Sequence, residues 1–148
     1  LKIEMNVLIK NSRFLRKSFL QKVFGEQFLK IEEEEDTLSE KNYIFINLVK
    51  DFILKNIDQE NLTIDEVASE LCMSRTTFFN KWKSLTGEAP KYFIYRIRME
   101  KARELLESGR YSVNVVPEMI GLRNLKNFRH KYKEYFGITP SESIMKKQ

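Results

Sequence analysis

Hydrophobic residues recur at helical spacing along most of the chain, which predicts a series of amphipathic α-helices. The first clear case ends near Asn56 and carries its apolar residues at Phe45, Leu48, Val49, Phe52 and Ile53. Thr37 and Glu40 precede this run with the spacing of a capping box, which closes the N-terminus of a helix. We therefore predict a helix that starts after Thr37, and a compact domain that begins near Glu40.

The next segment has the pattern of two short helices joined by a tight turn. Thr63 and Glu66 form a capping box that opens the first helix, and Ser74 is a suitable N-cap for the second. We place the turn at Cys72 and expect the second helix to run to about Ser84. The residues expected to face the core are Ile64, Val67, Ala68, Leu71, Phe78, Trp82 and Leu85.

A longer helix is predicted over residues 90–107, with Pro90 at its first position. One side carries Phe93, Ile94, Ile97 and Leu105, and the other side carries Tyr95, Met99, Ala102 and Leu106. A helix that is apolar on two sides has another element packed against each side. We therefore predict that this helix bridges two subdomains.

The sequence beyond the bridging helix repeats the sequence before it. A shift of 49 positions takes Thr63, Ile64, Val67 and Leu71 to Ser112, Val113, Val116 and Ile120. A shift of 50 positions pairs Phe78, Lys81, Trp82, Lys83, Gly87 and Pro90 with Phe128, Lys131, Tyr132, Lys133, Gly137 and Pro140. The pattern predicts an all-α fold with two helix-turn-helix subdomains, over residues 62–86 and 112–136.

Composition excludes several classes of function. The 148 residues include one cysteine and one histidine, so the chain has no disulfide framework and no thiolate zinc cluster, as suits a reducing cytoplasm. The longest apolar runs are only a few residues, and charged residues interrupt every window long enough to cross a membrane. No nucleophile–base pair, metal cluster or glycine-rich phosphate loop is present. We therefore expect no enzyme activity, no cofactor and no small-molecule site.

Charge points to a polyanion as the partner. The formal net charge of +5 divides into −1 over residues 1–40 and +6 over residues 41–148. Residues 58–70 hold five acidic and no basic side chains, whereas residues 121–133 hold five basic and no acidic ones. This asymmetry is typical of a surface that binds a polyanion in one orientation, although a solvated helix face has the same pattern.

Helix-turn-helix geometry makes double-stranded DNA the expected polyanion. The second helix of each copy lies in the major groove, with polar side chains near its start against base edges and cations against phosphates. Thr76 and Asn80 supply such polar groups in the first copy, and Lys126, Asn127 and His130 supply them in the second. Two such helices on one bridge would reach successive major grooves about 34 Å apart.

Over about residues 45–145 the chain resembles AraC/XylS-type DNA-binding domains. The resemblance rests on residues 64–71, 73–76, 78–82, 85–90 and 136–141, and on Phe93, Ile94, Ile97, Arg98, Ala102, Leu105, Leu106, Gly121, Phe128 and Lys133. Members of this family are transcription regulators, usually activators. The resemblance implies sequence-specific DNA binding here, with RNA polymerase as a further partner.

The resemblance implies that Thr76, Phe79 and Asn80 face bases in the first copy, and that Lys126, Asn127 and His130 do so in the second. Phe79 would touch a thymine methyl group or be half-packed beside the core. Arg123 and Arg129 are suited to the DNA backbone. The full candidate set is Ser74, Arg75, Thr76, Thr77, Phe79, Asn80, Lys81, Lys83, Arg123, Asn124, Lys126, Asn127, Arg129, His130 and Lys133.

Pro117 departs from the family pattern, which has a small alanine at this place in the second copy. In a helix interior its ring would cost roughly 3 kcal/mol, so the helix either starts late, with Pro117 near its first turn, or is kinked. Other departures are Val115, Leu122, Asn127 and Cys72, the last standing where glycine usually ends the helix. Our hypothesis is that the second copy is strained and contributes phosphate contacts more than sequence reading.

Residues 1–39 form a separate N-terminal segment before the domain over residues 40–148. Residues 1–29 predict a helix, and residues 32–36 an acidic linker. Residues 1–30 resemble the end of a response-regulator receiver domain, which precedes AraC-type output domains in hybrid two-component sensors. An ordinary amphipathic helix has the same pattern. The chain starts at Leu1 rather than Met, which suggests a piece of a longer protein.

These observations lead to two hypotheses. The first is a cytoplasmic DNA-binding output module of a transcription activator in two-component signalling, whose full-length parent is membrane-anchored if it is a hybrid sensor. Self-association would use the N-terminal helix or domains upstream of it. The second is a protein-interaction module, in which a degenerate helix-turn-helix pair binds a protein partner and its DNA binding is weak or lost.

Overall fold

Seven α-helices follow one another through residues 36–145, the part of the chain that the computed structural model describes, and no strand lies among them. They are α3 (Asp36–Lys55), α4 (Ile64–Glu70), α5 (Arg75–Thr86), α6 (Pro90–Glu107), α7 (Val116–Met119), α8 (Leu125–Phe136) and α9 (Pro140–Met145). The all-α prediction is confirmed for these residues. The helix predicted over residues 1–29 lies outside them.

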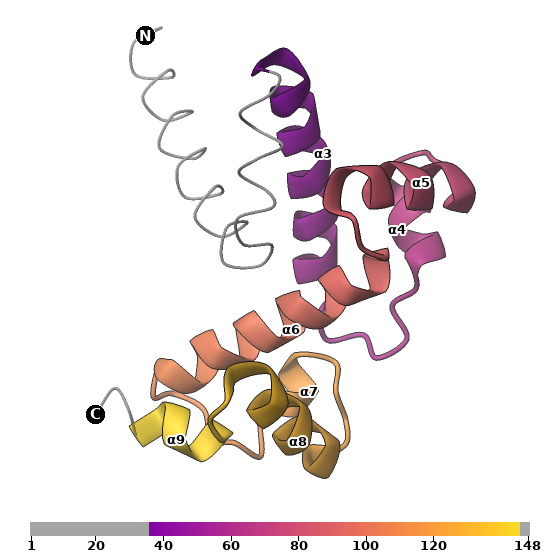
Figure 1. Cartoon of the computed structure of the whole chain (residues 1–148). Helices are drawn as coiled ribbons and strands as arrows, with labels where there is room; N and C mark the ends of the chain where they lie inside the picture. Colours follow the sequence, from indigo (N-terminus) through magenta and orange to yellow (C-terminus); the bar gives the residue numbers. More distant parts are fainter. Residues whose placement is uncertain (1–35, 146–148) are drawn as a thin grey trace, which may run out of the picture.

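The long helix α6 joins two groups of helices. Figure 1 shows α3, α4 and α5 gathered at one end of α6, and α7, α8 and α9 at the other end. We call these groups the first half and the second half. Each half has its own hydrophobic core, to which α6 contributes side chains from a different part of its length. The prediction of a bridging helix over residues 90–107 is therefore confirmed.

Helix α3 packs on α4 and α6 with a face that differs from the predicted one. Phe45, Ile46, Val49 and Ile53 are buried, whereas 51% of Leu48 is exposed. Each residue of a helix is turned about 100° from the one before it. A core centred near Val49 therefore leaves Leu48 facing outward. Residues Asp36–Lys55 are helical, and the side chain of Thr37, on which the predicted capping box depends, lies outside the described residues.

Local signals define the first helix-turn-helix. The capping box at α4 is formed, because the Thr63 N–H donates to Glu66 Oε2 at 3.0 Å and the Glu66 N–H donates to Thr63 Oγ1 at 3.2 Å. The turn contains Cys72 in the left-handed region, with φ 56°. Ser74 caps α5 by accepting the Thr77 N–H at 3.1 Å. Helix α5 then extends to Thr86, slightly beyond the predicted end.

Aromatic rings fill the centre of the first core. Phe78 and Trp82 of α5 are fully buried, and the Trp82 ring lies 4.6 Å, centroid to centroid, from Phe93 of α6. Phe45 of α3 lies 6.2 Å from Trp82 on the same measure. These contacts attach the inner face of α5 to both α3 and α6. The opposite face of α5 is therefore held outward.

The second half repeats this arrangement with a shorter first helix. Residues 113–115 form a turn, and α7 covers only Val116–Met119, with Pro117 in its first turn. Helix N-termini leave their first N–H groups unpaired, so proline costs little there. Of the two predicted outcomes, the late start is therefore correct and the kink is wrong. Among the described residues, the non-glycine residue with positive φ is Cys72, in the first half.

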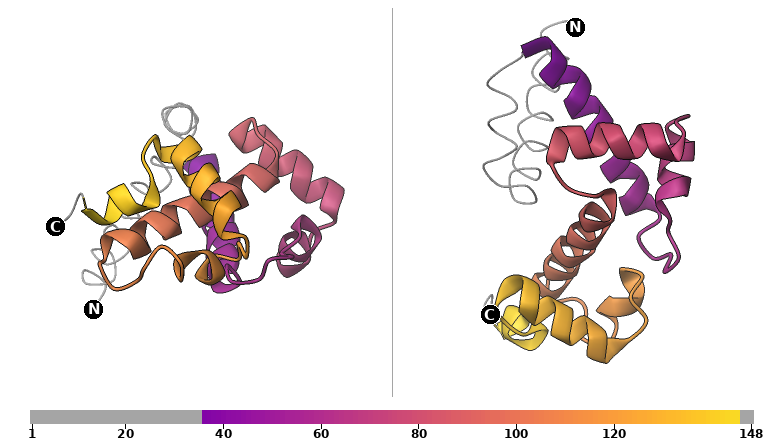
Figure 2. Two further views of the ribbon diagram at one scale, coloured as in Figure 1. Left: turned by 90° about the horizontal axis from the view of Figure 1, so that it is seen from below. Right: turned by 45° about the vertical axis from the view of Figure 1, so that its right-hand side comes forward.

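The second core is built on the C-terminal part of α6. Phe128 and Tyr132 of α8 are buried against Met99, Ala102 and Leu106. Leu105 also packs against this second core, and its assignment to the other side of α6 is wrong. Figure 2 shows α9 lying beside the end of α6, and the two helices pack together. Helix α9 begins at Pro140, as α6 begins at Pro90 in the first copy.

Candidate nucleic-acid interface

Helix α5 of the first half and helix α8 of the second half present equivalent surfaces. In Figure 1, α5 lies above the upper end of α6 and α8 lies below α6. Each is anchored by two fully buried aromatic residues, Phe78 and Trp82 in α5 and Phe128 and Tyr132 in α8. The polar side chains between these anchors are exposed in both helices. Each half thus displays the outer face of its second helix to solvent.

The start of α5 combines a capping group with exposed polar groups. Ser74 is engaged in the cap, and its hydroxyl also donates to Thr77 Oγ1 at 2.8 Å. Arg75 Nε lies 3.6 Å from Asp65 Oδ1 of α4. Thr76, Thr77, Phe79, Asn80 and Lys83 are exposed, and Phe79 at 36% is the most covered of these. The base-facing positions implied for α5 are therefore accessible to a ligand.

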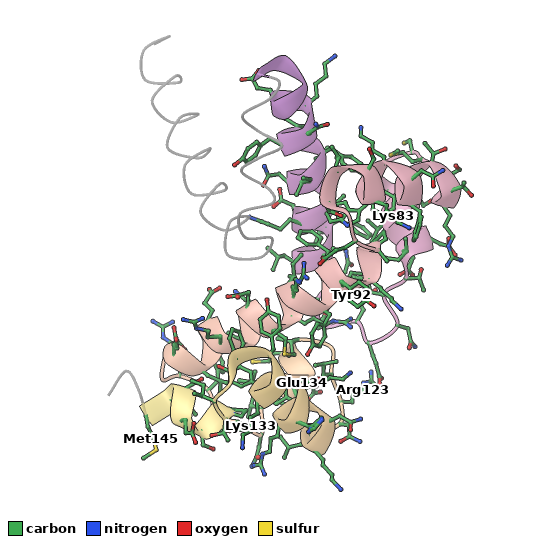
Figure 3. All side chains as sticks on the ribbon, in the orientation of Figure 1. Lys83, Tyr92, Arg123, Lys133, Glu134 and Met145 are labelled. Atoms are coloured by element: carbon green, nitrogen blue, oxygen red, sulfur yellow. The ribbon has the colours of Figure 1, made fainter. Side chains whose placement is uncertain are left out.

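The start of α8 repeats this pattern with more positive charge. Asn124 caps the helix by accepting the Asn127 N–H at 3.0 Å. Lys126, Asn127, Arg129 and Lys133 are exposed. His130 is exposed as well, and its Nε2 lies 3.9 Å from Glu134 Oε2. Figure 3 shows Arg123 and Lys133 at opposite ends of this helix. The second copy therefore offers cations along its whole outer face.

Two lysines at matching places of the repeat lie over aromatic rings. Lys81 Nζ lies 4.3 Å from the ring centre of Phe45, and Lys131 Nζ lies 6.0 Å from that of Tyr95. A cation in this position is attracted by the ring quadrupole. Both side chains therefore extend toward the flank of their helix. Of the two, Lys81 belongs to the predicted set, and its ring contact was not foreseen.

Acidic residues before and within α4 pair with the predicted basic residues. Glu60 Oε2 lies 3.3 Å from Arg123 Nε, and Asp65 pairs with Arg75. The acidic run over residues 58–70 was visible in the sequence, but its partners were not, because Glu60 and Arg123 are far apart in the chain. These pairs hold two candidate phosphate-binding arginines at the edge of the surface.

The described residues contain no group of three or more His, Cys, Asp or Glu side chains that could hold a metal ion. Within the same part of the chain, no helix is long and apolar enough to cross a membrane. The exposed groups of α5 and α8 are hydrogen-bond donors, acceptors and cations. Such groups suit base edges and phosphate oxygens.

Comparisons with known proteins agree with this geometry. A family described as a helix-turn-helix domain matches residues 67–144, which is more than half of the chain. Histidine kinase P4 of Formosa agariphila is 33% identical over 87 residues, which are 59% of this chain and 6% of that kinase. The match therefore spans only a small part of the length of that relative.

Two solved structures are similar in both fold and sequence. The C-terminal domain of AraT, a response regulator from Geobacillus stearothermophilus, has a TM-score of 0.61 and 26% identity, covering 69% of this chain and 84% of that one. The DNA-binding domain of AdpA, a global transcriptional factor solved in complex with a target DNA, has a TM-score of 0.57 and 28% identity, covering 68% and 89%. The chain belongs to the helix-turn-helix family of AraC-type DNA-binding domains of transcription regulators.

Proposed function

We propose that the chain binds double-stranded DNA sequence-specifically, with α5 and α8 in successive major grooves on one side of the duplex. The observation that carries this proposal is the equivalence of the two helices. Both are capped by a polar side chain, anchored by two buried aromatic residues, and exposed on the face opposite these anchors. A single bridge that presents two such helices suits a target with two half-sites.

The exposed side chains divide into two roles. Thr76, Phe79 and Asn80 of α5 stand where bases are read, as do Lys126, Asn127 and His130 of α8. An asparagine amide can make a paired contact with adenine, and a lysine can reach the acceptor atoms of guanine. The cations that suit the phosphates are Arg75, Lys83, Arg123, Arg129 and Lys133.

We further propose that this domain is the output module of a two-component system and acts as an activator that contacts RNA polymerase in the cytoplasm. Its similarity to a response-regulator C-terminal domain and to a histidine kinase supports the two-component setting. Phosphorylation would then take place in a region upstream of Leu1, and the segment of residues 1–39 would connect the two. Self-association would involve that segment or the upstream region.

Selection of bound duplexes from random DNA tests the proposal. We expect two half-motifs whose centres are roughly one helical turn of DNA apart. The affinity for the selected duplex should fall steeply with salt, because each neutralised phosphate contributes roughly 0.9 to the log–log slope. A flat salt dependence with affinity typical of protein partners would instead indicate a protein-interaction module.

Matched variants make this test specific. Lys133→Ala removes a cation from the outer face of α8, and it should weaken binding to all sequences alike while reducing the slope by about 1. Arg110→Ala removes another exposed cation just beyond α6, at the end of that helix farthest from α5 in Figure 1. The Arg110 variant should bind as the parent does. Equal losses in both variants would speak against a localised DNA-binding face.

A further inference from the structure

Within residues 36–145, helix α6 is one connection between the two halves of the molecule, and a loop is another. Among the described helices, every pair with extensive contact either lies within one half or includes α6. The second connection is the loop over residues 56–63 between α3 and α4, which we call the α3–α4 loop. Its residue Ile57 packs against both hydrophobic cores, and it is the one described residue that the two cores share.

The α3–α4 loop is seated on Gly121, in the turn between α7 and α8. Gly121 is buried and has φ +78°. A Cβ atom at this position would lie 2.5 Å from the carbonyl oxygen of Ile57 and 3.2 Å from that of Gln59. Contacts this short cannot be relieved by turning a side chain, because both oxygens belong to the backbone. The two backbones can approach so closely only because residue 121 is glycine.

The first copy of the repeat shows that positive φ alone does not require glycine in this turn. The residue that corresponds to Gly121 there is Cys72, which has φ 56° and is exposed. A side chain is therefore tolerated in the same backbone conformation where no other segment lies against it. The requirement for glycine at position 121 comes from the contact with the α3–α4 loop.

Two arginines also bind the α3–α4 loop near Gly121. Arg98 of α6 donates from Nη2 to the carbonyl oxygen of Gln59 at 2.8 Å, and the same nitrogen would lie 3.1 Å from a Cβ at Gly121. Arg123 pairs with Glu60 from the other side. In Figure 3, Arg123 lies beneath the loop that connects α3 and α4. The loop therefore contacts α6 through Arg98, and it contacts the α7–α8 turn through Gly121 and Arg123.

We propose that the α3–α4 loop is a brace that fixes the orientation of α8 relative to α5, with Gly121 as its seat. A helix alone can bend and twist, whereas two separate connections hold two bodies at a set angle. The brace would thereby determine which spacing of the two DNA half-sites the protein accepts. This consequence, unlike the brace itself, rests on the proposed function.

A distance measurement in the full chain tests the brace without DNA. Nitroxide labels on the native Cys72 and on Glu134→Cys, both exposed positions, report on the first and second half respectively. We expect one narrow distance distribution by pulsed electron paramagnetic resonance, and a shifted or broadened one after Gly121→Ala. Gly109→Ala is the matched control, because Gly109 has φ +73° with nothing within 4 Å of an added Cβ. If Gly121→Ala and Gly109→Ala give the same distribution, the brace is refuted.

A second variant covers the case in which Gly121→Ala does not fold, as judged by its thermal unfolding. Ile57→Ala removes the side chain shared by the two cores and leaves the backbone unchanged. It should also broaden the distance distribution. A narrow, unshifted distribution in a folded Ile57→Ala protein would overturn the proposal.

Half-site selection then tests the consequence for DNA. Relative to Gly109→Ala, Gly121→Ala should lose about tenfold or more in affinity for the preferred spacing, because linked modules lose avidity when their geometry no longer matches the target. Its affinity for a single half-site read by α5 should stay unchanged. An unaltered spacing preference would refute the link to specificity. If the parent selects no DNA sequence, the proposed function fails, while the distance measurement still decides whether the brace exists.

Discussion

The hydroxyl groups of Tyr132 and Ser143 lie 2.6 Å apart inside the core of the second half, where both side chains are buried. This hydrogen bond connects α8 to α9. The corresponding position in the first half is Trp82, which packs against the ring of Phe93 instead. The two halves of the repeat therefore stabilise their second helices by different means, one with a polar pair and the other with an aromatic pair.

Removing one partner of this pair should be costly. Ser143→Ala leaves the Tyr132 hydroxyl buried without a partner, and we expect it to lower the free energy of unfolding by about 1–3 kcal/mol. Ser141→Ala, at an exposed position of the same helix, should change it by about 0.5 kcal/mol or less. Urea denaturation measures both. If the two variants are equally stable, the hydrogen bond contributes nothing to stability.

Alkaline pH should destabilise the second half. Burial raises the pKa values of Tyr95, Tyr132 and Tyr135 above the usual value, so the folded state favours the neutral phenols. Their contribution is complete below the pKa of the unfolded chain and is lost as the pH rises through the folded values. The free energy of unfolding should therefore decline above about pH 10. Tyr132→Phe should decline less steeply in the same denaturation series, and a slope identical to that of the parent would contradict this.

Replacing Cys72 by glycine should stabilise the protein. At φ 56° an L side chain is strained by roughly 1–2 kcal/mol, and the greater flexibility of glycine in the unfolded chain offsets part of the gain. We expect Cys72→Gly to raise the free energy of unfolding by about 0.5–1 kcal/mol. Cys72→Ala keeps the Cβ and should bring no such gain. Equal stability of the two variants in urea would argue against strain at this turn.

Helix ends were predictable from the sequence because their signals are local. The Thr63–Glu66 capping box, the Ser74 cap and the proline that opens α6 involve residues within one turn of each other, and all three are formed. The face that a helix buries depends instead on its neighbours. This is why Leu48 and Leu105 were assigned incorrectly, although the periodicity of both helices was recognised.

For the candidate DNA-binding residues too, local features were predictable from the sequence and contacts between remote segments were not. Repeat spacing located α5 and α8 and the exposure of their polar faces, because the buried aromatic residues fix which side of each helix faces inward. The sequence did not reveal that Glu60 contacts Arg123 or that the α3–α4 loop rests on Gly121. Both contacts join segments that are remote in the chain, and no local sequence pattern predicts them.

Asn127 provides the sharpest test of whether the second copy reads sequence. Its helix is capped and anchored like α5, and Pro117 lies in the first turn of α7, where proline costs little, so we expect Asn127 to contact a base. Asn127→Ala should then cost about 1–3 kcal/mol of binding free energy, confined to one base pair of the second half-site. Asn80→Ala should produce the corresponding loss in the first half-site. Affinities measured against a set of single-base-pair substitutions would show this. A uniform loss across all of these duplexes, as expected for Lys133→Ala, would mean that α8 contributes phosphate contacts only.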